Sequence, residues 1–100
     1  MRLRFTDEAK KRLHAIEQHI AQDAPQRARD VVLRLIQQAQ TIPTNPRRGR
    51  VVPEFVRDDI REILERPYRI IYRVGPDMID ILSIMHYRQL LPSDLSDVVK

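Results

Sequence analysis

The chain has 100 residues, with 18 lysines and arginines against 14 aspartates and glutamates, which gives a formal net charge of +4. This length predicts one domain spanning residues 1–100, and the absence of cysteine excludes disulfides and thiolate zinc sites. No apolar run approaches the ~18–20 residues of a membrane helix and no signal-peptide core follows the N-terminus, so we expect a soluble, cytoplasmic protein without a membrane partner.

The first half of the chain predicts a short strand and two helices. "RLRF" alternates basic and apolar residues, as a half-buried strand does. Thr6 is a suitable N-cap for a helix from about Asp7 to Ala21, and Asp23 can cap a second helix that carries Pro25 in its first turn. The expected buried stripes are Ala9, Leu13, Ile16 and Ile20 in the first helix, and Ala28, Val31, Val32, Leu35, Ala39 and Ile42 in the second. The short link between the helices predicts an antiparallel hairpin.

After "NPRRGR", with Gly49 in a turn, the hydrophobic period changes from helical to alternating. "IREILE", "YRIIYRV" and "MIDILSIMHY" predict three strands in an antiparallel meander, because "RP" and "GPD" leave room only for short turns. The sequence therefore predicts an α+β fold of order β-α-α-β-β-β, with the helical hairpin packed on one face of a small antiparallel sheet. The tail "LPSDLSDVVK" predicts one short helix capped by Ser93, or a frayed end.

The last strand is apolar on both faces. Strict alternation places Ile79, Ile81 and Met85 on one face and Met78, Leu82 and Ile84 on the other. The hairpin can cover only one of these faces. We therefore expect a free chain to leave Met78, Leu82 or Ile84 partly exposed and a partner chain to cover part of that face.

Arginine without lysine dominates the region that leads into the sheet. The residues concerned are Arg47, Arg48, Arg50, Arg57, Arg61, Arg66, Arg69 and Arg73. This bias indicates an anionic partner, either nucleic acid or an acidic protein. The alternative is a solvated face with local ion pairs to Glu54, Asp58, Asp59, Glu62 and Glu65.

The histidines do not indicate a metal site. His14 and His19 lie among polar neighbours of the first helix, and their separation of five residues does not suit a helical metal pair. His86 ends the last strand, where it can exchange protons or serve as a structural hydrogen-bonding group. We predict no metal and no cofactor.

The order of these elements, together with "NPRRGR", "YRIIYRV" and "IMHYRQLLP", resembles the RelE/ParE superfamily of bacterial toxins from Leu3 to about Pro92. The resemblance implies the toxin of a type II toxin–antitoxin system, bound by a small acidic antitoxin. Antitoxin or target contacts would then fall on the arginines at the beginning and end of the sheet: Arg48, Arg50, Arg61, Arg69, Arg73 and Arg88.

The superfamily has two branches with different targets. RelE-like members are similar to ribonucleases that cut messenger RNA on the ribosome, and this branch implies catalytic roles for Arg69, His86, Tyr87 and Arg88. The lysines that such nucleases carry after the second helix are replaced by "RRGR", and no tyrosine follows Arg88. "RRGR", "RIIYR" and "H-x-R-x-L" instead resemble ParE toxins, which bind DNA gyrase and poison it. The sequence favours the gyrase branch and leaves open whether the chain is an enzyme. A plain nucleic-acid-binding module ranks last, because few aromatic residues are available for stacking.

Overall fold

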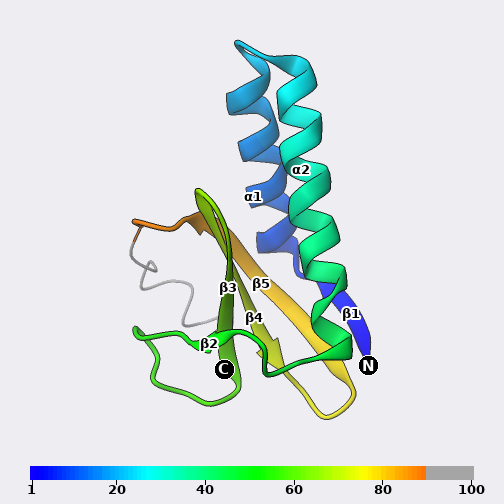
Figure 1. Cartoon of the computed structure of the whole chain (residues 1–100), viewed down its shortest axis with the longest axis vertical. Helices are drawn as coiled ribbons and strands as arrows, with labels where there is room; N and C mark the ends of the chain where they lie inside the picture. Colours follow the sequence, from blue (N-terminus) through cyan, green and yellow to red (C-terminus); the bar gives the residue numbers. More distant parts are fainter. Residues whose placement is uncertain (90–100) are drawn as a thin grey trace.

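The computed structural model describes residues 1–89, so the predicted tail helix and its Ser93 cap lie outside the described residues. It confirms an α+β fold in which a helical hairpin packs on one face of a sheet, with the link between the helices projecting beyond the sheet (Figure 1). The elements in chain order are β1 (Arg2–Phe5), α1 (Asp7–Ala21), α2 (Pro25–Gln40), the 3-10 turn η1 (Ile42–Thr44), β2 (Arg50–Val51), β3 (Ile60–Glu65), β4 (Tyr68–Val74) and β5 (Met78–His86).

The two helices begin differently. The Thr6 side chain caps α1, because its Oγ1 accepts the Ala9 N–H at 3.2 Å and donates to the Ile81 carbonyl at 2.8 Å. The predicted cap of α2 at Asp23 is wrong. Ala24 occupies that position and its side chain makes no cap bond, because Pro25 at the first helical position fixes the boundary one residue later.

The strands form one sheet in the order β1-β5-β4-β3-β2. The predicted meander of β3, β4 and β5 is antiparallel, as expected. β1 adds a parallel edge beside β5, and the short β2, which the sequence analysis did not predict, adds an antiparallel edge beside β3. The sheet is therefore mixed, because its first strand is placed by contacts with a strand that lies more than 70 residues further along the chain.

A bulge in β5 changes which side chains share a face. Ile71 pairs with Ser83 but Tyr72 pairs with Ile81, so Leu82 is the extra residue. The strict alternation predicted for this strand is therefore wrong after Leu82. Ile84 joins Ile81 in the core beneath the helices, and Met85 lies in the core on the opposite face.

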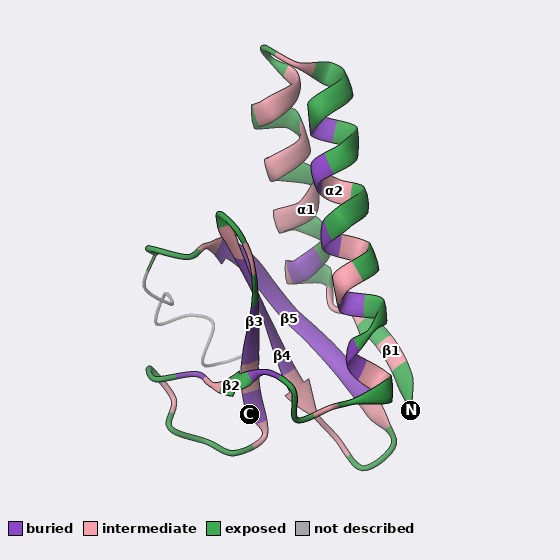
Figure 2. Cartoon of the chain, viewed as in Figure 1, coloured by how far each residue is buried: buried purple, intermediate pink, exposed green. Residues whose placement is uncertain are grey.

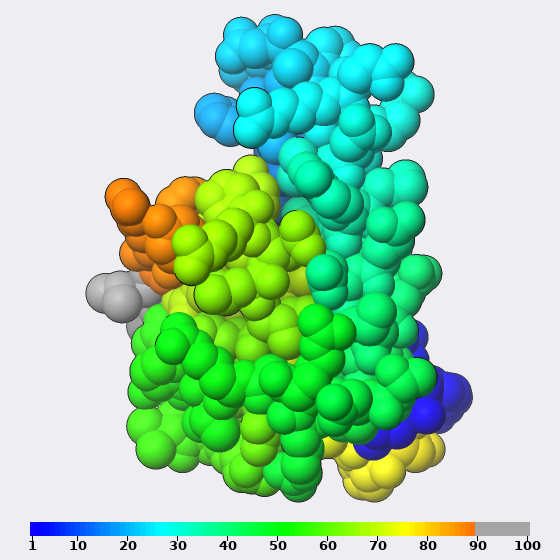
Figure 3. Space-filling view, viewed as in Figure 1, coloured from blue at the N-terminus to red at the C-terminus, as the bar shows by residue number. Residues whose placement is uncertain are grey.

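Both faces of the sheet are covered by this chain (Figure 2). The hairpin covers one face. The second face carries a smaller core of Val52, Ile60, Ile71, Leu82 and Met85, against which Phe55 packs. Figure 3 shows the segment that contains Val52 and Phe55, in green, as the lower part of the visible surface beside α2. The expectation that Leu82 and Ile84 would stay partly exposed is wrong, since they are 1% and 0% exposed; Met78 is partly exposed, as expected.

Candidate functional site

Arg69 lies at the centre of a buried ion-pair network on the second face of the sheet. Its Nη1 donates to Glu62 Oε1 at 2.8 Å, and its Nη2 donates to Glu54 Oε2 and to the Gln89 carbonyl, both at 2.6 Å. Glu62 on β3 also accepts from Arg50 Nε at 2.5 Å. Because Arg69 and Glu62 are only 4% and 1% exposed, these charges compensate each other away from solvent.

This network keeps Arg69 charged. Burial alone would lower the pKa of Arg69, but the hydrogen bonds and charges of Glu54 and Glu62 outweigh burial and raise the pKa above its ordinary value. A substrate phosphate could reach this guanidinium only by displacing a buried carboxylate. Arg69 therefore has the environment of a structural arginine.

A second charged cluster lies at the β1 side of the same face. Asp80 is 6% exposed and accepts from Arg73 Nη2 at 2.6 Å and from Arg4 Nε at 2.9 Å. Arg73 and Asp80 are directly opposite each other on β4 and β5. Arg73, a predicted interface residue, is thus already paired with a carboxylate of its own sheet.

The "NPRRGR" loop is held by the Tyr72 hydroxyl. This hydroxyl donates to the Pro46 carbonyl at 2.7 Å and accepts the Gly49 N–H at 3.0 Å, and burial raises the pKa of Tyr72. A Cβ at Gly49 would lie 2.6 Å from both the Tyr72 hydroxyl and the Glu62 carbonyl, so only glycine fits. Arg61 Nη1 donates to the Gly49 carbonyl at 2.8 Å. Arg61 therefore helps to hold the loop in place.

Most arginines of the region from Arg47 to Arg73 form local ion pairs, which is the alternative that the sequence left open. Arg47 and Arg61 contact Asp58, and Arg57 contacts Asp59. The hydrogen bond from Arg47 lowers the pKa of Asp58. Among the described residues, Arg48 has only neutral partners, Thr41 and Gln38, and Arg66 has none.

The end of β5 carries the other predicted catalytic residues. The His86 ring meets Tyr68 edge-on at 6.3 Å and stacks on Tyr87 at 5.0 Å between ring centroids. Arg88 donates its N–H to His86 Nδ1 at 3.2 Å and its Nε–H to the Tyr87 hydroxyl at 2.9 Å. His86 therefore uses one ring nitrogen in a local turn, and Tyr87 and Arg88 are exposed.

These residues line two different grooves. A groove of about 350 Å³ is lined by Arg50, Pro53, Glu54, Arg69, Tyr87, Arg88 and Gln89. His86 instead lines a groove of about 310 Å³ beside α1, together with residues such as Ile16, His19 and Tyr68. Arg50, Arg69, Tyr87 and Arg88 thus share one groove, and His86 lines the neighbouring groove while its Nδ1 accepts the Arg88 N–H.

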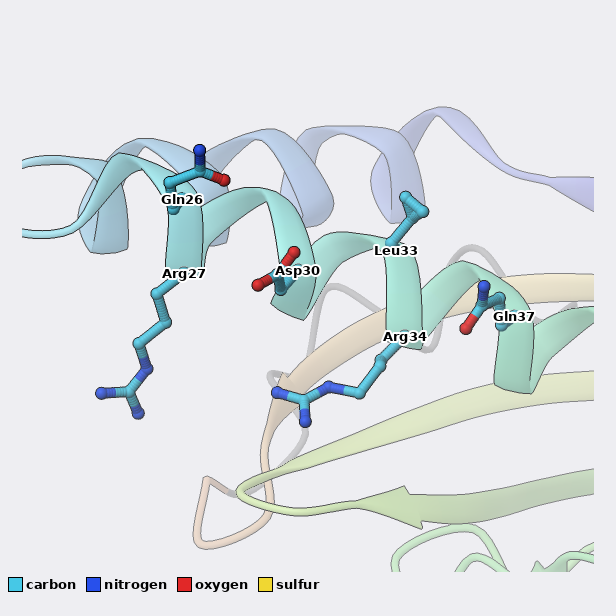
Figure 4. A pocket seen from close by; sticks show the side chains of 6 residues that line it. All are labelled: Gln26, Arg27, Asp30, Leu33, Arg34 and Gln37. Atoms are coloured by element: carbon cyan, nitrogen blue, oxygen red, sulfur yellow. The ribbon is translucent and has the colours of Figure 1, made fainter.

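The sequence analysis missed the arginines of α2. Arg27 and Arg34 line a cleft of about 140 Å³ together with Glu65 and Arg66 at the β3–β4 turn. Among the described residues, neither Glu65 nor any other carboxylate forms an ion pair with these three arginines. Figure 4 shows Arg27 and Arg34 extending from α2 towards the β3–β4 hairpin, whereas Gln26 and Leu33 point away from it. The seven-residue spacing of Arg27 and Arg34, which is two helical turns, was the available signal.

Two kinds of site are not found in the described part of the chain. Within residues 1–89, no group of three histidine, aspartate or glutamate side chains could hold a metal ion. No helix in this range is long and apolar enough to cross a membrane.

Comparisons with known proteins agree with the fold. The family described as "ParE toxin of type II toxin-antitoxin system, parDE" matches residues 3–91. The candidate toxin Y4kP of Sinorhizobium fredii is 35% identical over 99 residues, which cover 94% of this chain and 96% of that protein. The chain is therefore similar to a curated relative over nearly its whole length.

Two solved structures share the architecture. The chromosomal ParDE toxin–antitoxin system from P. aeruginosa superposes with a TM-score of 0.74 at 29% identity, covering 86% of this chain and 95% of the other. The RelBE2 toxin–antitoxin complex from Mycobacterium tuberculosis gives a TM-score of 0.62 at 20% identity, covering 88% and 92%. The second likeness concerns the fold alone.

Proposed function

The chain belongs to the ParE toxin family of type II toxin–antitoxin systems, and from this premise we propose that it inhibits growth by binding and poisoning DNA gyrase. The alternative is ribosome-dependent cleavage of messenger RNA, as the resemblance to the RelE branch implies. The proposed target also places the protein in the cytoplasm.

We favour gyrase binding over messenger RNA cleavage because of the arrangement of the candidate catalytic residues. Cleavage by a 2′-hydroxyl requires a base, a cation for the phosphorane and an acid for the leaving oxygen, all around one phosphate. Arg69 is buried and bound by two carboxylates, so its guanidinium already has anionic partners in place of a phosphate. His86 uses Nδ1 to accept the Arg88 N–H. These bonds support a toxin that acts by binding its target.

The end of β5 is the surface that we assign to the target. Tyr87 and Arg88 are exposed there, and Arg50 lies on the same groove with most of its side chain in solvent. In this proposal, Arg50 and Arg88 contact the target directly. Arg61, Arg69 and Arg73 support the surface from within, because their guanidinium groups are held by the chain itself.

The partner in this proposal is a cognate acidic antitoxin in a heteromeric complex. Both solved relatives described above are toxin–antitoxin assemblies. The net charge of +4 favours an acidic partner by long-range attraction. Binding of the antitoxin would keep the toxin from its target.

A supercoiling assay with purified gyrase tests the proposed target. We expect the wild-type protein to inhibit supercoiling and to increase cleaved plasmid after detergent and protease treatment. Arg88→Ala and Tyr87→Ala should weaken inhibition at least roughly tenfold, since exposed arginine and aromatic residues dominate binding surfaces. Arg29→Ala on the outer side of α2 removes the same charge and should leave inhibition unchanged.

The same preparation should be added to translating ribosomes, with primer extension to map cuts in the messenger RNA. We expect no cuts at codon-defined positions. Robust cutting by the wild type, lost in His86→Gln, would establish the nuclease alternative and contradict the gyrase proposal.

A further inference from the structure

The edge of β3 is only partly covered by the described chain. β2 pairs with β3 through Arg50–Glu62 and Val51–Arg61 and through no later pair. The Val52 N–H donates to the Ile60 carbonyl at 3.1 Å, so the β3 residues whose backbone groups face this edge are Ile60, Glu62 and, two residues further on, Leu64. Beyond Glu62, the edge of β3 is therefore open within residues 1–89.

Leu64 is the free position on this edge. It pairs with Arg69 of β4, but its N–H and carbonyl face away from β4, and neither is hydrogen-bonded to another described residue. Its side chain is 46% exposed. A groove of about 340 Å³ runs along this edge, lined by Arg48, Gly49, Arg50, Glu62, Ile63 and Leu64. An open strand edge with an apolar side chain can pair with an extended peptide.

Unpaired arginines flank both ends of this edge. Arg48 lies at the β2 end, where it contacts Gln38 and Thr41 at the C-terminal end of α2. Arg27 and Arg34 extend from α2 at the other end (Figure 4), where they share a cleft with Arg66 of the β3–β4 turn. We call the surface formed by Arg27, Arg34, Arg48, Leu64 and Arg66 the α2–β3 trough. It combines a strand edge with guanidinium groups that no described carboxylate occupies.

We propose that the α2–β3 trough binds an extended acidic segment of a partner protein as an added strand on β3. The backbone of the segment pairs with Leu64, and its carboxylates meet Arg27, Arg34, Arg48 and Arg66. The inference deepens the proposed function and rests on it, because it locates the docking site of the proposed antitoxin. The sequence analysis assigned antitoxin or target contacts to Arg48, Arg50, Arg61, Arg69, Arg73 and Arg88, and of these only Arg48 belongs to the trough.

Charge and hydrogen bonding favour an acidic peptide in the trough over a nucleic acid or a second copy of this chain. A nucleic acid would match the arginines, but it offers no peptide backbone to pair with the strand edge. A second copy of this chain would offer a strand edge, but it would bring two sets of unpaired arginines together. Only an acidic peptide complements both the edge and the charges.

The test uses the wild-type chain and its proposed cognate antitoxin. Amide hydrogen exchange should show rapid exchange at Leu64 in the free chain and strong protection in the complex. A complex in which the Leu64 amide exchanges as fast as in the free chain would overturn the proposed docking site. A free chain that is dimeric by light scattering and already protected at Leu64 would overturn it too, in favour of pairing between copies.

Charge variants provide an independent measurement. The triple variant Arg27→Gln/Arg34→Gln/Arg66→Gln should weaken antitoxin binding by roughly tenfold to a hundredfold, as expected for three exposed ion pairs. The matched control Lys10→Gln/Lys11→Gln/Arg29→Gln loses the same charge from exposed positions away from the trough and should change affinity by less than roughly threefold. Equal losses in the two variants would overturn the proposal, because attraction would then follow net charge alone.

Variants of Leu64 test the proposed backbone pairing with the edge of β3. Leu64→Pro removes the N–H that would pair with the added strand and should weaken binding at least roughly tenfold, whereas Leu64→Thr keeps this N–H and should bind nearly as the wild type does. Antitoxin that binds wild type with an unprotected Leu64 contradicts only the docking site. Antitoxin that fails to bind wild type at all contradicts the proposed partner as well.

Discussion

At the scale of single residues, the chain pairs its own charges before it meets any partner. Arg69 and Arg73, which the sequence marked as sites for an anion, are bound by Glu62 and Asp80 of neighbouring strands. A buried arginine that loses its carboxylate leaves an uncompensated charge, so these pairs contribute to folding rather than to recognition. Arginines that form no ion pair with a described residue, such as Arg34 and Arg48, keep their charge available to a partner.

Removing one member of the buried pair should be far more costly than removing both. We expect Arg69→Ala to lower the free energy of unfolding by about 3–5 kcal/mol, because Glu62 stays buried without its main partner. The double variant Arg69→Met/Glu62→Leu should recover most of that loss. Urea unfolding of Arg69→Met, Glu62→Leu and the double variant measures the coupling; strictly additive losses would contradict the buried pair.

Tyr72 should make the fold sensitive to alkaline pH. Its pKa is raised in the fold, first of all by burial, so folding favours the neutral phenol. This contribution to stability is complete below the unfolded pKa of about 10 and is lost as pH rises through the higher folded pKa.

The comparison with Tyr72→Phe isolates this effect. At neutral pH the variant should be less stable by about 1–3 kcal/mol, because the Gly49 N–H loses its acceptor and the Pro46 carbonyl loses its donor. Thermal unfolding between neutral pH and about pH 11 should show a steeper alkaline decline in the wild type than in the variant. Parallel declines would show that Tyr72 does not titrate with unfolding.

At the scale of secondary-structure elements, the bulge in β5 lets one strand contribute to two cores. Ile79, Ile81 and Ile84 pack beneath the helices, while Leu82 and Met85 pack on the second face with Val52. An apolar run on both faces of a strand is therefore compatible with a chain that covers both faces itself. The apolar second face alone does not indicate a partner.

Substitutions on the buried and exposed faces of α2 should differ sharply in their effect on stability. Leu35 is fully buried against the sheet, so Leu35→Ala should cost about 2–5 kcal/mol through lost burial and a residual cavity. Leu33 on the same helix is 47% exposed, and Leu33→Ala should change stability by about 0.5 kcal/mol or less. Chemical denaturation of both variants provides the measurement, and equal losses would mean that the buried face of α2 was misassigned.

At the scale of the whole molecule, one surface gathers several positive charges that no described carboxylate pairs with. Arg27, Arg34, Arg48 and Arg66 border the α2–β3 trough, whereas Arg69 and Arg73 on the second face are paired with carboxylates. Such an asymmetric field accelerates encounters with an acidic partner and has little influence on contacts already formed.

Association with the antitoxin should therefore depend strongly on salt. Stopped-flow mixing across a salt series should show an association rate that falls steeply as salt is added, while the dissociation rate changes little. In the variant Arg27→Gln/Arg34→Gln/Arg66→Gln the slope should be flatter than in the wild type. An association rate indifferent to salt in the wild type would contradict electrostatic steering.

The sequence by itself determined the elements whose signals are local. Thr6, the helical stripe of α1 and the alternation of Tyr68, Ile70 and Tyr72 each depend on residues a few positions apart, and each is found where the pattern predicted it. The family and the position of Arg88 at the end of β5 also followed from such patterns. The same local signals placed the helix cap at Asp23, where the fixed boundary at Pro25 overrides the preference of a single polar side chain.

Only the tertiary structure decided which charges meet. No periodicity in the sequence joins Arg69 to Glu54 and Glu62, or Arg4 to Asp80, because these pairs arise from strand register and from a loop that folds over the sheet. Register also set the bulge at Leu82, and with it the face on which Met85 lies. A charged side chain is attracted to any opposite charge within reach, so its partner is chosen by the fold that brings the two together.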